Sequence, residues 1–221
     1  MSLDFSHVWE SIDFILWGAS HTLEISLMAF ALALLIAYAV GIARARHLPR
    51  WLSLPLGAYV EVFRGTPLLV QLFLIYYGLP QVGIVMNAWT AGVVGLGLNS
   101  GAYMSEVVRA SLLSVDRGQS EAAEALGYGR RQTLWHIVLP QATRIAIPPL
   151  TNSLASLLKE SSLVSIIAIT ELTRVGNIIY SRTMAPFEIY LTLAFLYLVM
   201  TSVVTLLSRR LERANRKWAT S

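Results

Sequence analysis

EAAEALGYGRRQTLWHIVLP, residues 121–140, is a charged, glycine-interrupted stretch in a chain whose other long segments are mostly apolar. It is too polar to cross a membrane, because charged side chains are costly at membrane depth. Acidic residues early in the stretch and Gly127 near its middle are capping signals of a short helix. A second short helix follows, with apolar residues on one face, and we expect Pro140 to stop it. The stretch therefore predicts two short helices joined at a glycine.

The composition of the whole chain is that of an integral membrane protein. Of its 221 residues, 55% are hydrophobic and only 14% are charged, and the mean hydropathy is +0.59. A soluble domain of this size carries about 25% charged residues. The chain contains no cysteine, which excludes disulfides and thiolate metal sites. Its first twenty residues are acidic and lack a basic start, so we expect no cleavable signal peptide.

Five segments are candidates for transmembrane helices, since a helical span needs roughly 20 mostly apolar residues. They lie at about 21–43, 52–79, 88–114, 146–169 and 188–208. The first and fifth are continuous apolar runs, whereas the other three also carry polar residues. We therefore expect an all-α membrane protein in which residues 1–221 form a single transmembrane domain of five spans.

The placement of lysine and arginine predicts the orientation. The loops after the first, third and fifth spans hold Arg44, Arg46, Arg50, Arg117, Arg130, Arg131, Arg144, Arg209, Arg210, Arg213, Arg216 and Lys217. The opposite loops hold only Arg174 and Arg182. Because cytoplasmic loops carry the excess of basic residues, we expect the amino terminus outside and the carboxyl terminus in the cytoplasm. Topology thus explains the net charge of +4 without nucleic-acid binding. On the cytoplasmic side, residues 117–140 form either a docking surface for a partner or a helix lying on lipid headgroups.

Small residues recur at four-residue spacing in two spans. They are Ala29, Ala33, Ala37 and Gly41 in the first span and Gly97 and Gly101 in the third. Such stripes let helix backbones approach closely in lipid, although these residues are also common in membrane helices generally. An odd number of spans argues against a fused pair of inverted repeats. A unit of five helices is too small to enclose a solute path alone, which suggests a dimer.

Charged side chains also occur inside the expected spans, where each costs about 2.5–3.5 kcal/mol and usually faces a cavity or a partner. Glu61 and Arg64 lie three residues apart, so they either neutralise each other on one helix face or belong to a solute pathway. Lys159 and Glu160 are neighbours, and their side chains point about 100° apart on a helix. Each needs another partner, which is either a zwitterionic substrate or a group on another helix.

The segment RGTP, residues 64–67, interrupts the second span, because proline removes a backbone hydrogen bond and glycine tolerates unusual dihedral angles. Irregular backbone at membrane depth is tolerated where it lines a cavity or is buried in protein. We expect this segment to form a gate or a binding element. Pro148 and Pro149 are instead expected to open the fourth span, where missing N–H groups cost little. The third span adds the polar residues Asn99, Ser100, Glu106 and Arg109.

The sequence carries no catalytic or nucleotide-binding motif. It has no G-x-x-x-x-G-K-[ST] loop, which excludes ATP binding by that route, and no H-E-x-x-H motif. Its histidines, His7, His21, His47 and His136, are scattered and are interpreted as ordinary polar side chains. We therefore expect no catalytic site and no cofactor in this chain. An ion-coupled secondary transporter or a channel subunit is the alternative class, although the chain shows no clear internal repeat.

The charged stretch carries the most specific resemblance to a known family. Glu121-Ala122-Ala123, Gly127, Ile137 and Leu139-Pro140 match the spacing of the EAA loop of ABC importer permeases. The segments FRGTPLLVQLFLIYYGLPQ (63–81), AYMSEVVRASLLSVDRGQSEAA (102–123) and KESSLVS (159–165) resemble the polar amino acid uptake subfamily, closest to its cystine-type and glutamine-type permeases. The resemblance covers roughly residues 18–212. Glu160 departs from the pattern, since relatives usually carry aspartate there.

The resemblance implies a type I ABC importer permease fold and one half of a two-fold dimer in the bacterial inner membrane. It implies that separate ATP-binding cassette subunits, which hold ATP and Mg²⁺, dock on the EAA loop, and that an external binding protein delivers a polar amino acid. The implied ATPase-coupling residues are Glu121, Ala122, Ala123, Gly127, Ile137 and Pro140. The candidate substrate-path residues are Glu61, Arg64, Thr66, Gln71, Asn99, Lys159 and Glu160. A homodimer is favoured over a heterodimer, because the EAA loop and the charged pair are both intact in this chain.

Overall fold

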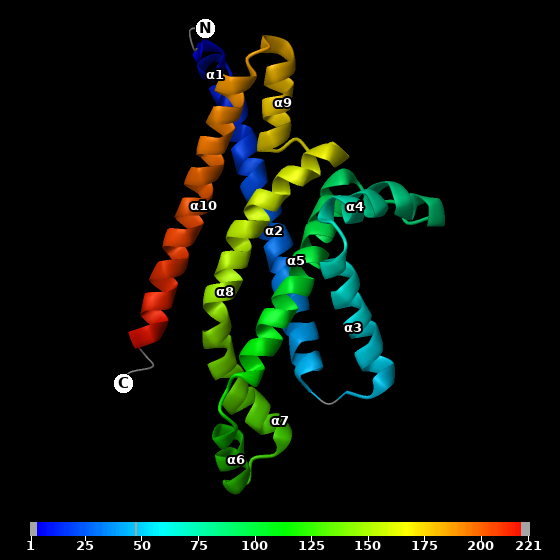
Figure 1. Ribbon diagram of the computed structural model, residues 1–221, viewed down its shortest axis with the longest axis vertical. Coiled ribbons are helices and arrows are strands. Elements are labelled where there is room, and N and C mark those ends of the chain that lie inside the picture. The colour runs from blue at the N-terminus through cyan, green and yellow to red at the C-terminus, as the bar shows by residue number, and fades with distance from the viewer. Residues whose placement is uncertain (1–3, 47, 218–221) are drawn as a thin grey trace.

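The computed structural model describes residues 4–46 and 48–217, with side chains as far as Arg210. Every regular element in these ranges is a helix, which confirms the all-α prediction there. The helices run mainly along one long axis (Figure 1). The side chains of Arg213, Arg216 and Lys217, which contributed to the predicted orientation, lie outside the described ones, as does His47.

Two long helices, α2 (Ile12–Ala45) and α5 (Ala88–Leu113), pack along each other at the centre of the bundle. The predicted small-residue stripes form this contact. Ala29, Ala33 and Ala37 are fully buried, and a Cβ atom added at Gly41 would lie 2.7 Å from the Ser105 carbonyl oxygen. A Cβ atom added at Gly97 would lie 2.6 Å from the Leu32 side chain. The stripes therefore allow the close approach of backbones that their spacing predicts.

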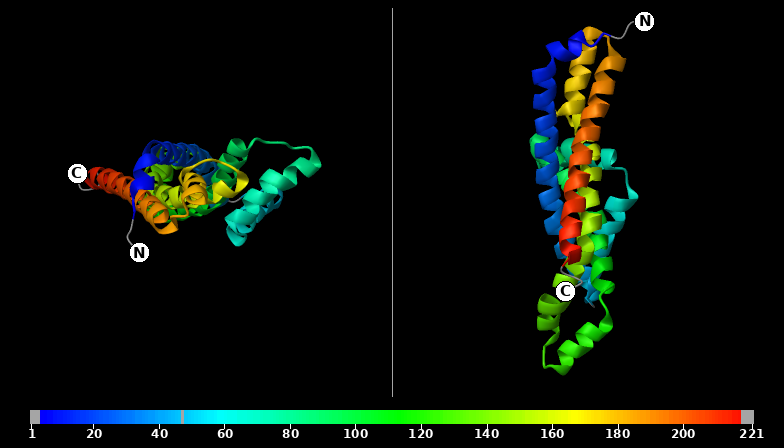
Figure 2. Two further views of the ribbon diagram at one scale, coloured as in Figure 1. Left: turned by 90° about the horizontal axis from the view of Figure 1, so that it is seen from above. Right: turned by 90° about the vertical axis from the view of Figure 1, so that its left-hand side faces the viewer.

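The second predicted span does not continue straight through residues 52–79. Helix α3 (Arg50–Gly65) ends at the RGTP segment, and the chain then turns by 111°. It continues as α4 (Leu68–Phe73), the π-helical turn η1 (Leu74–Gly78) and the 3₁₀ turn η2 (Leu79–Val82). Thr66 is extended (φ −120°, ψ 148°), as expected for a residue before proline. Residues 68–82, which we call the arm, project sideways from the bundle (Figure 2).

The charged stretch forms α6 (Arg117–Ala125), α7 (Arg130–Thr133) and the π-helical turn η3 (Leu134–Val138). The break at Gly127 is confirmed, since this residue has a φ of +86°. The stop at Pro140 is wrong, because η3 runs directly into α8 (Leu139–Glu160). The N–H of Leu139 bonds to the Leu134 carbonyl, five residues back. This register change comes just before Pro140 and accommodates its missing donor.

Helix α8 is longer than the fourth predicted span. Pro148 and Pro149 lie inside it rather than at its start, so that expectation is wrong as well. Interior prolines are tolerated in membrane helices where neighbouring groups hydrogen-bond to the backbone carbonyls that the proline leaves without a donor. Beyond Glu160 the chain tightens into the 3₁₀ helix η4 (Ser161–Ile167) and then bends by 52° into α9 (Leu172–Thr183).

The amino-terminal helix α1 (Ser6–Glu10) lies beside α9 and the start of α10 (Pro186–Lys217) at one end of the bundle (Figure 1). These elements and the start of α2 share a hydrophobic cluster that includes Ile15 of α2, Leu172 and Ile189, all fully buried. Helices α6 and α7 lie at the opposite end (Figure 1). The predicted docking stretch and the amino terminus are therefore separated by the length of the bundle.

Two described helices, α2 and α10, are long and apolar enough to cross a membrane by themselves, with mean hydropathies of 2.5 and 2.1. Counting α3 with the arm, and residues 130–167 with α9, as bent spans raises the number to four. Helix α5, which matches the remaining predicted span, carries the polar residues Asn99, Ser100, Glu106 and Arg109 and is less apolar.

Candidate functional site

A cavity of about 340 Å³, lined mainly by polar residues, opens between α5 and α8. It is lined by Asn99, Ser100 and Tyr103 from α5 and by Pro149, Asn152, Ser153, Ser156 and Glu160 from α8. The α8 residues recur at intervals of three and four, which places them on one face of that helix. Glu160 supplies the one carboxylate of this lining, and no basic side chain belongs to it.

Lys159 lies outside the cavity lining and is exposed, whereas Glu160 is half-buried. The two neighbouring side chains thus point in different directions, as the helical geometry predicts. Among the described residues no salt bridge involves either of them. The structure therefore does not join Lys159 and Glu160 to an ion-pair partner on another helix of the same chain.

Asn99 and Gln71 form a buried hydrogen-bond network with the RGTP segment. The Asn99 amide donates to the Phe63 carbonyl and to Gln71 Oε1, each at 3.0 Å. The Gln71 amide donates to the Phe63 carbonyl at 2.9 Å and to the carbonyl and hydroxyl of Thr66 at 3.0 and 2.8 Å. These bonds supply donors to backbone carbonyls that have no intrahelical partner because the helix breaks there. Thr66, Gln71 and Asn99 are brought together, and Asn99 links this network to the cavity.

Arg64 and Glu61 are both exposed, and no ion pair joins them within the described part of the chain. The Arg64 guanidinium lies 5.3 Å from the centre of the Tyr103 ring, a cation–π contact. The Tyr103 hydroxyl donates to the Arg64 carbonyl at 3.1 Å. Arg64 therefore reaches the edge of the cavity through Tyr103, whereas Glu61 is not among the lining residues.

Of the lining residues, the sequence predicted only Asn99 and Glu160 for the substrate path. Ser100 was noted only as a polar residue, Pro149 was assigned to the start of a span, and Tyr103, Asn152, Ser153 and Ser156 were missed. A periodicity signal was present, because Tyr103 lies one helical turn after Asn99, and Ser156 lies one turn before Glu160. Polar residues at that spacing inside an apolar helix mark one polar face. The polar face of α8 lies against α5 because of how the two helices pack. The sequence pattern does not predict this packing.

A charged cluster ties α2 to α5 on the side of the cavity nearer to α6. Glu106 pairs with Arg44 of α2 and, through two hydrogen bonds of 2.8 and 3.0 Å, with Arg109 of its own helix. Glu106 and Arg109 are one turn apart, so their pairing follows from helical spacing. Arg44 is 62 residues away from Glu106 and comes from another helix.

The EAA residues lie on α6 and the turn after it. Glu121 and Ala122 are exposed, and Ala123 is buried. The Gly127 N–H bonds to the Glu124 carbonyl at 2.9 Å, and the Tyr128 N–H bonds to the Ala123 carbonyl at 3.0 Å. A Cβ atom at Gly127 would meet nothing within 4 Å, so its positive φ rather than crowding requires glycine.

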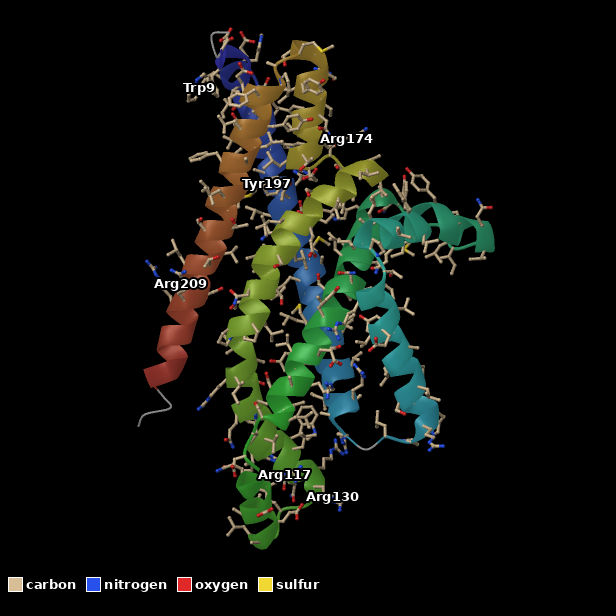
Figure 3. The ribbon with its side chains drawn as sticks, viewed as in Figure 1. Trp9, Arg117, Arg130, Arg174, Tyr197 and Arg209 are labelled. Atoms are coloured by element: carbon tan, nitrogen blue, oxygen red, sulfur yellow. The ribbon has the colours of Figure 1, made fainter. Side chains whose placement is uncertain are left out.

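Helix α6 packs against η3, where Ile137 is half-buried, and Pro140 is exposed just beyond. Leu126, at the outer end of α6, is 79% exposed. Arg117 and Arg130 also lie at this end of the molecule (Figure 3). The α6–η3 unit therefore presents an exposed surface that carries both charged and apolar groups.

Residues 23–217 match the family of binding-protein-dependent transport system inner membrane components. The chain is 38% identical over 216 residues to the glutamine transport system permease protein GlnP of Escherichia coli (strain K12), covering 96% of this chain and 98% of that protein. It is 36% identical over 213 residues to the L-cystine transport system permease protein TcyB of Bacillus subtilis (strain 168), covering 93% and 90% of the two chains.

Two solved structures have the same fold. An amino acid ABC transporter with histidines superposes with a TM-score of 0.90 at 38% identity, covering 97% of this chain and 100% of that chain. The inward-facing methionine ABC transporter MetNI gives a TM-score of 0.80 at 21% identity, covering 93% and 98% of the two chains. The chain therefore belongs to the family of binding-protein-dependent transport system inner membrane components, as a permease of the type I ABC importer fold.

Proposed function

We propose that this chain is the transmembrane permease subunit of an ATP-driven importer that moves a polar amino acid across the bacterial inner membrane. Relatives named for glutamine and cystine transport support this substrate class. In this proposal the chain crosses the membrane five times, with its amino terminus outside and its carboxyl terminus in the cytoplasm. The placement of Arg117 and Arg130 at the end opposite to the amino terminus supports this orientation (Figure 3).

The cavity between α5 and α8 is the proposed amino acid site, and it is the observation that carries the proposal. Its volume of about 340 Å³ is sufficient for a small ligand. The Glu160 carboxylate matches an α-ammonium group, while the amide of Asn152 and the hydroxyl of Ser156 can donate hydrogen bonds to the carboxylate or to a polar side chain. Because no basic side chain lines the cavity, we expect neutral or cationic amino acids to be preferred over anionic ones.

The α6–η3 unit is the proposed contact with an ATP-binding cassette subunit, which holds ATP and Mg²⁺ and performs all hydrolysis. The helix that begins at Arg130 continues through η3 and α8 as far as Glu160. A displacement of α6 and η3 can therefore be passed along a continuous helical segment to the cavity wall. This continuity supports a mechanism in which closure of the ATPase subunits reshapes the amino acid site.

The complete importer is proposed to contain two permease chains, two ATPase subunits and an external substrate-binding protein. The cavity opens between only two helices of this chain, so a second copy would complete the solute path. A homodimer is favoured, because this chain carries both the α6 coupling surface and the cavity.

Uptake by the reconstituted importer tests the proposal. The chain, its ATPase subunit and its binding protein would be placed in proteoliposomes, and uptake of a panel of labelled amino acids measured with and without internal ATP. We expect saturable, ATP-dependent uptake of a polar amino acid that falls strongly in Glu160→Gln. The absence of ATP-dependent uptake for every amino acid would overturn the proposed function.

A further inference from the structure

Glu171 is a carboxylate with no exposed surface, at the junction between η4 and α9. No salt bridge involves it among the residues that the structure describes. Arg174, one turn away, is exposed, and its guanidinium lies 3.4 Å from the Ser165 carbonyl instead. A buried carboxylate without a cation is costly unless hydrogen-bond donors surround it. The mechanism proposed above gives Glu171 no role.

The donors around Glu171 come from three helices. The N–H groups of Arg174 and Thr173 donate to Oε1 at 2.9 Å and to Oε2 at 3.0 Å, which caps α9. The Tyr197 hydroxyl of α10 donates to Oε2 at 2.9 Å. The Thr22 hydroxyl of α2 lies 3.3 Å from the same oxygen and 3.1 Å from the Gly18 carbonyl, so its one hydrogen is shared between these two acceptors. Figure 3 shows Tyr197 on the part of α10 beside this junction.

Two further bonds tighten this cluster, which we call the Glu171 clamp (Thr22, Glu171, Leu172, Thr173 and Tyr197). The Leu172 N–H donates to Thr22 Oγ1 at 3.0 Å. The hydroxyls of Thr173 and Tyr197 lie 2.9 Å apart. The described partners of the carboxylate are thus donors, which suits an ionised group. An amide at position 171 would turn an N–H group toward another donor.

The chain between the cavity and the clamp is unusual. Helix η4 makes seven residues of 3₁₀ structure, longer than the three or four that are common, and such a stretch in a helical segment often marks a hinge. Ala168, directly after it, has a φ of +66°. Glu160, which lines the cavity, is the last residue of α8 before this stretch.

We propose that the Glu171 clamp is a fixed point that makes η4 the hinge of the transport cycle, an inference that rests on the proposed ATP coupling through α6. Glu171 is in this account a positioning residue, which acts on the cavity through η4. The clamp joins α9 to α2 and α10. A displacement of α8 is then absorbed between Glu160 and Ala168 and changes the cavity, while α9 stays in place.

Tyr197→Phe and Glu171→Asp test this role. The first removes one interhelical donor. The second keeps a good N-cap but shortens the side chain, so it separates capping from the bonds to Thr22 and Tyr197. Tyr190→Phe is the matched control, because the Tyr190 hydroxyl also joins α10 to α9, donating to Asn177 Oδ1 at 2.9 Å on the surface.

The informative readout is the number of amino acid molecules moved per ATP hydrolysed in proteoliposomes, with the melting temperature of the complex measured in parallel. We expect both clamp variants to lower this ratio about tenfold, the order expected for losing a hydrogen bond to a charged group. ATP hydrolysis should persist, and Tyr190→Phe should leave the ratio unchanged. An unchanged ratio in the clamp variants, with or without a lower melting temperature, would overturn the hinge proposal.

A distance measurement keeps the hinge proposal testable apart from transport. The chain has no cysteine, so spin labels can be placed on cysteines introduced only at Ser181 of α9 and Leu198 of α10, both exposed. We expect a narrow distance distribution in the assembled complex, unaffected by ATP, and a broad one in Tyr197→Phe. A narrow distance distribution in Tyr197→Phe as well as in the chain that keeps Tyr197 would overturn the clamp. Failure of ATP-dependent uptake in the unchanged chain, with the clamp distances as expected, would instead overturn the proposed function.

Discussion

Lys159 and Glu160 follow each other in the sequence, yet only Glu160 lines the cavity between α5 and α8. Lys159 is exposed, and no described residue pairs with it. The two charges therefore have separate surroundings, and substitutions at the two positions should have different effects on transport.

Replacing Glu160 by glutamine should raise the KM for uptake by about tenfold or more, since a charge-assisted hydrogen bond to an ammonium group is lost. Lys159→Met, the matched control on the adjacent position, should change the KM less. Initial uptake rates across a range of substrate concentrations measure both effects. A larger effect of Lys159→Met would contradict the assignment of the cavity as the amino acid site.

Replacing Gln71 by leucine should destabilise the chain by about 1–3 kcal/mol, because the Thr66 carbonyl loses its donor and the Asn99 amide loses Gln71 as an acceptor, while the Phe63 carbonyl keeps only Asn99. Gln81→Leu, an exposed position on the same arm, serves as control and should have little effect. Thermal unfolding of the purified protein in detergent gives the comparison. Equal stability of the two variants would show that the network does not hold the bend.

Gly41→Ala should destabilise the contact between α2 and α5, because the added Cβ atom would lie 2.7 Å from the Ser105 carbonyl oxygen. Gly57→Ala introduces the same methyl group where no atom lies within 4 Å and should be neutral or stabilising by up to about 1 kcal/mol. Melting temperatures of the two variants should therefore shift in opposite directions or by clearly different amounts. A smaller loss in Gly41→Ala than in Gly57→Ala would contradict the packing.

Gly127→Val should abolish uptake while the protein still inserts in the membrane, since a β-branched residue is strained at a φ of +86°. The turn between α6 and α7 would change, and with it the proposed coupling surface. Gly129→Ala is the control in the same turn, because Gly129 has a φ of −71° and only an ordinary contact with Gln132. Normal uptake by Gly127→Val would contradict the coupling role of this turn.

Local signals in the sequence predicted much of this fold. The apolar runs predicted α2 and α10, the glycine and the acidic residues predicted the break at Gly127, and the small-residue spacing predicted the close contact at Gly41. These features depend on residues a few positions apart. The same local rules failed at Pro140. The rule that proline stops a helix does not account for a π-helical turn before the proline, which here lets the helix continue.

The site could be predicted only in part, because it is formed by contacts between distant segments. The sequence identified Asn99 and Glu160 as unusual polar groups, but their common cavity depends on how α5 packs against α8. The pairing of Arg44 with Glu106 and the bond from Tyr197 to Glu171 likewise depend on helix register. A polar residue in an apolar helix shows that a partner is needed, and tertiary packing decides which one.

The source of energy for uptake tests the central claim most directly. Proteoliposomes containing the chain, its ATPase subunit and its binding protein would be loaded with ATP, and uptake measured with and without an ionophore that abolishes ion gradients. We predict uptake that persists with the ionophore and stops when internal ATP is removed. Uptake that proceeds without the ATPase subunit and collapses with the ionophore would contradict the account and identify an ion-coupled transporter.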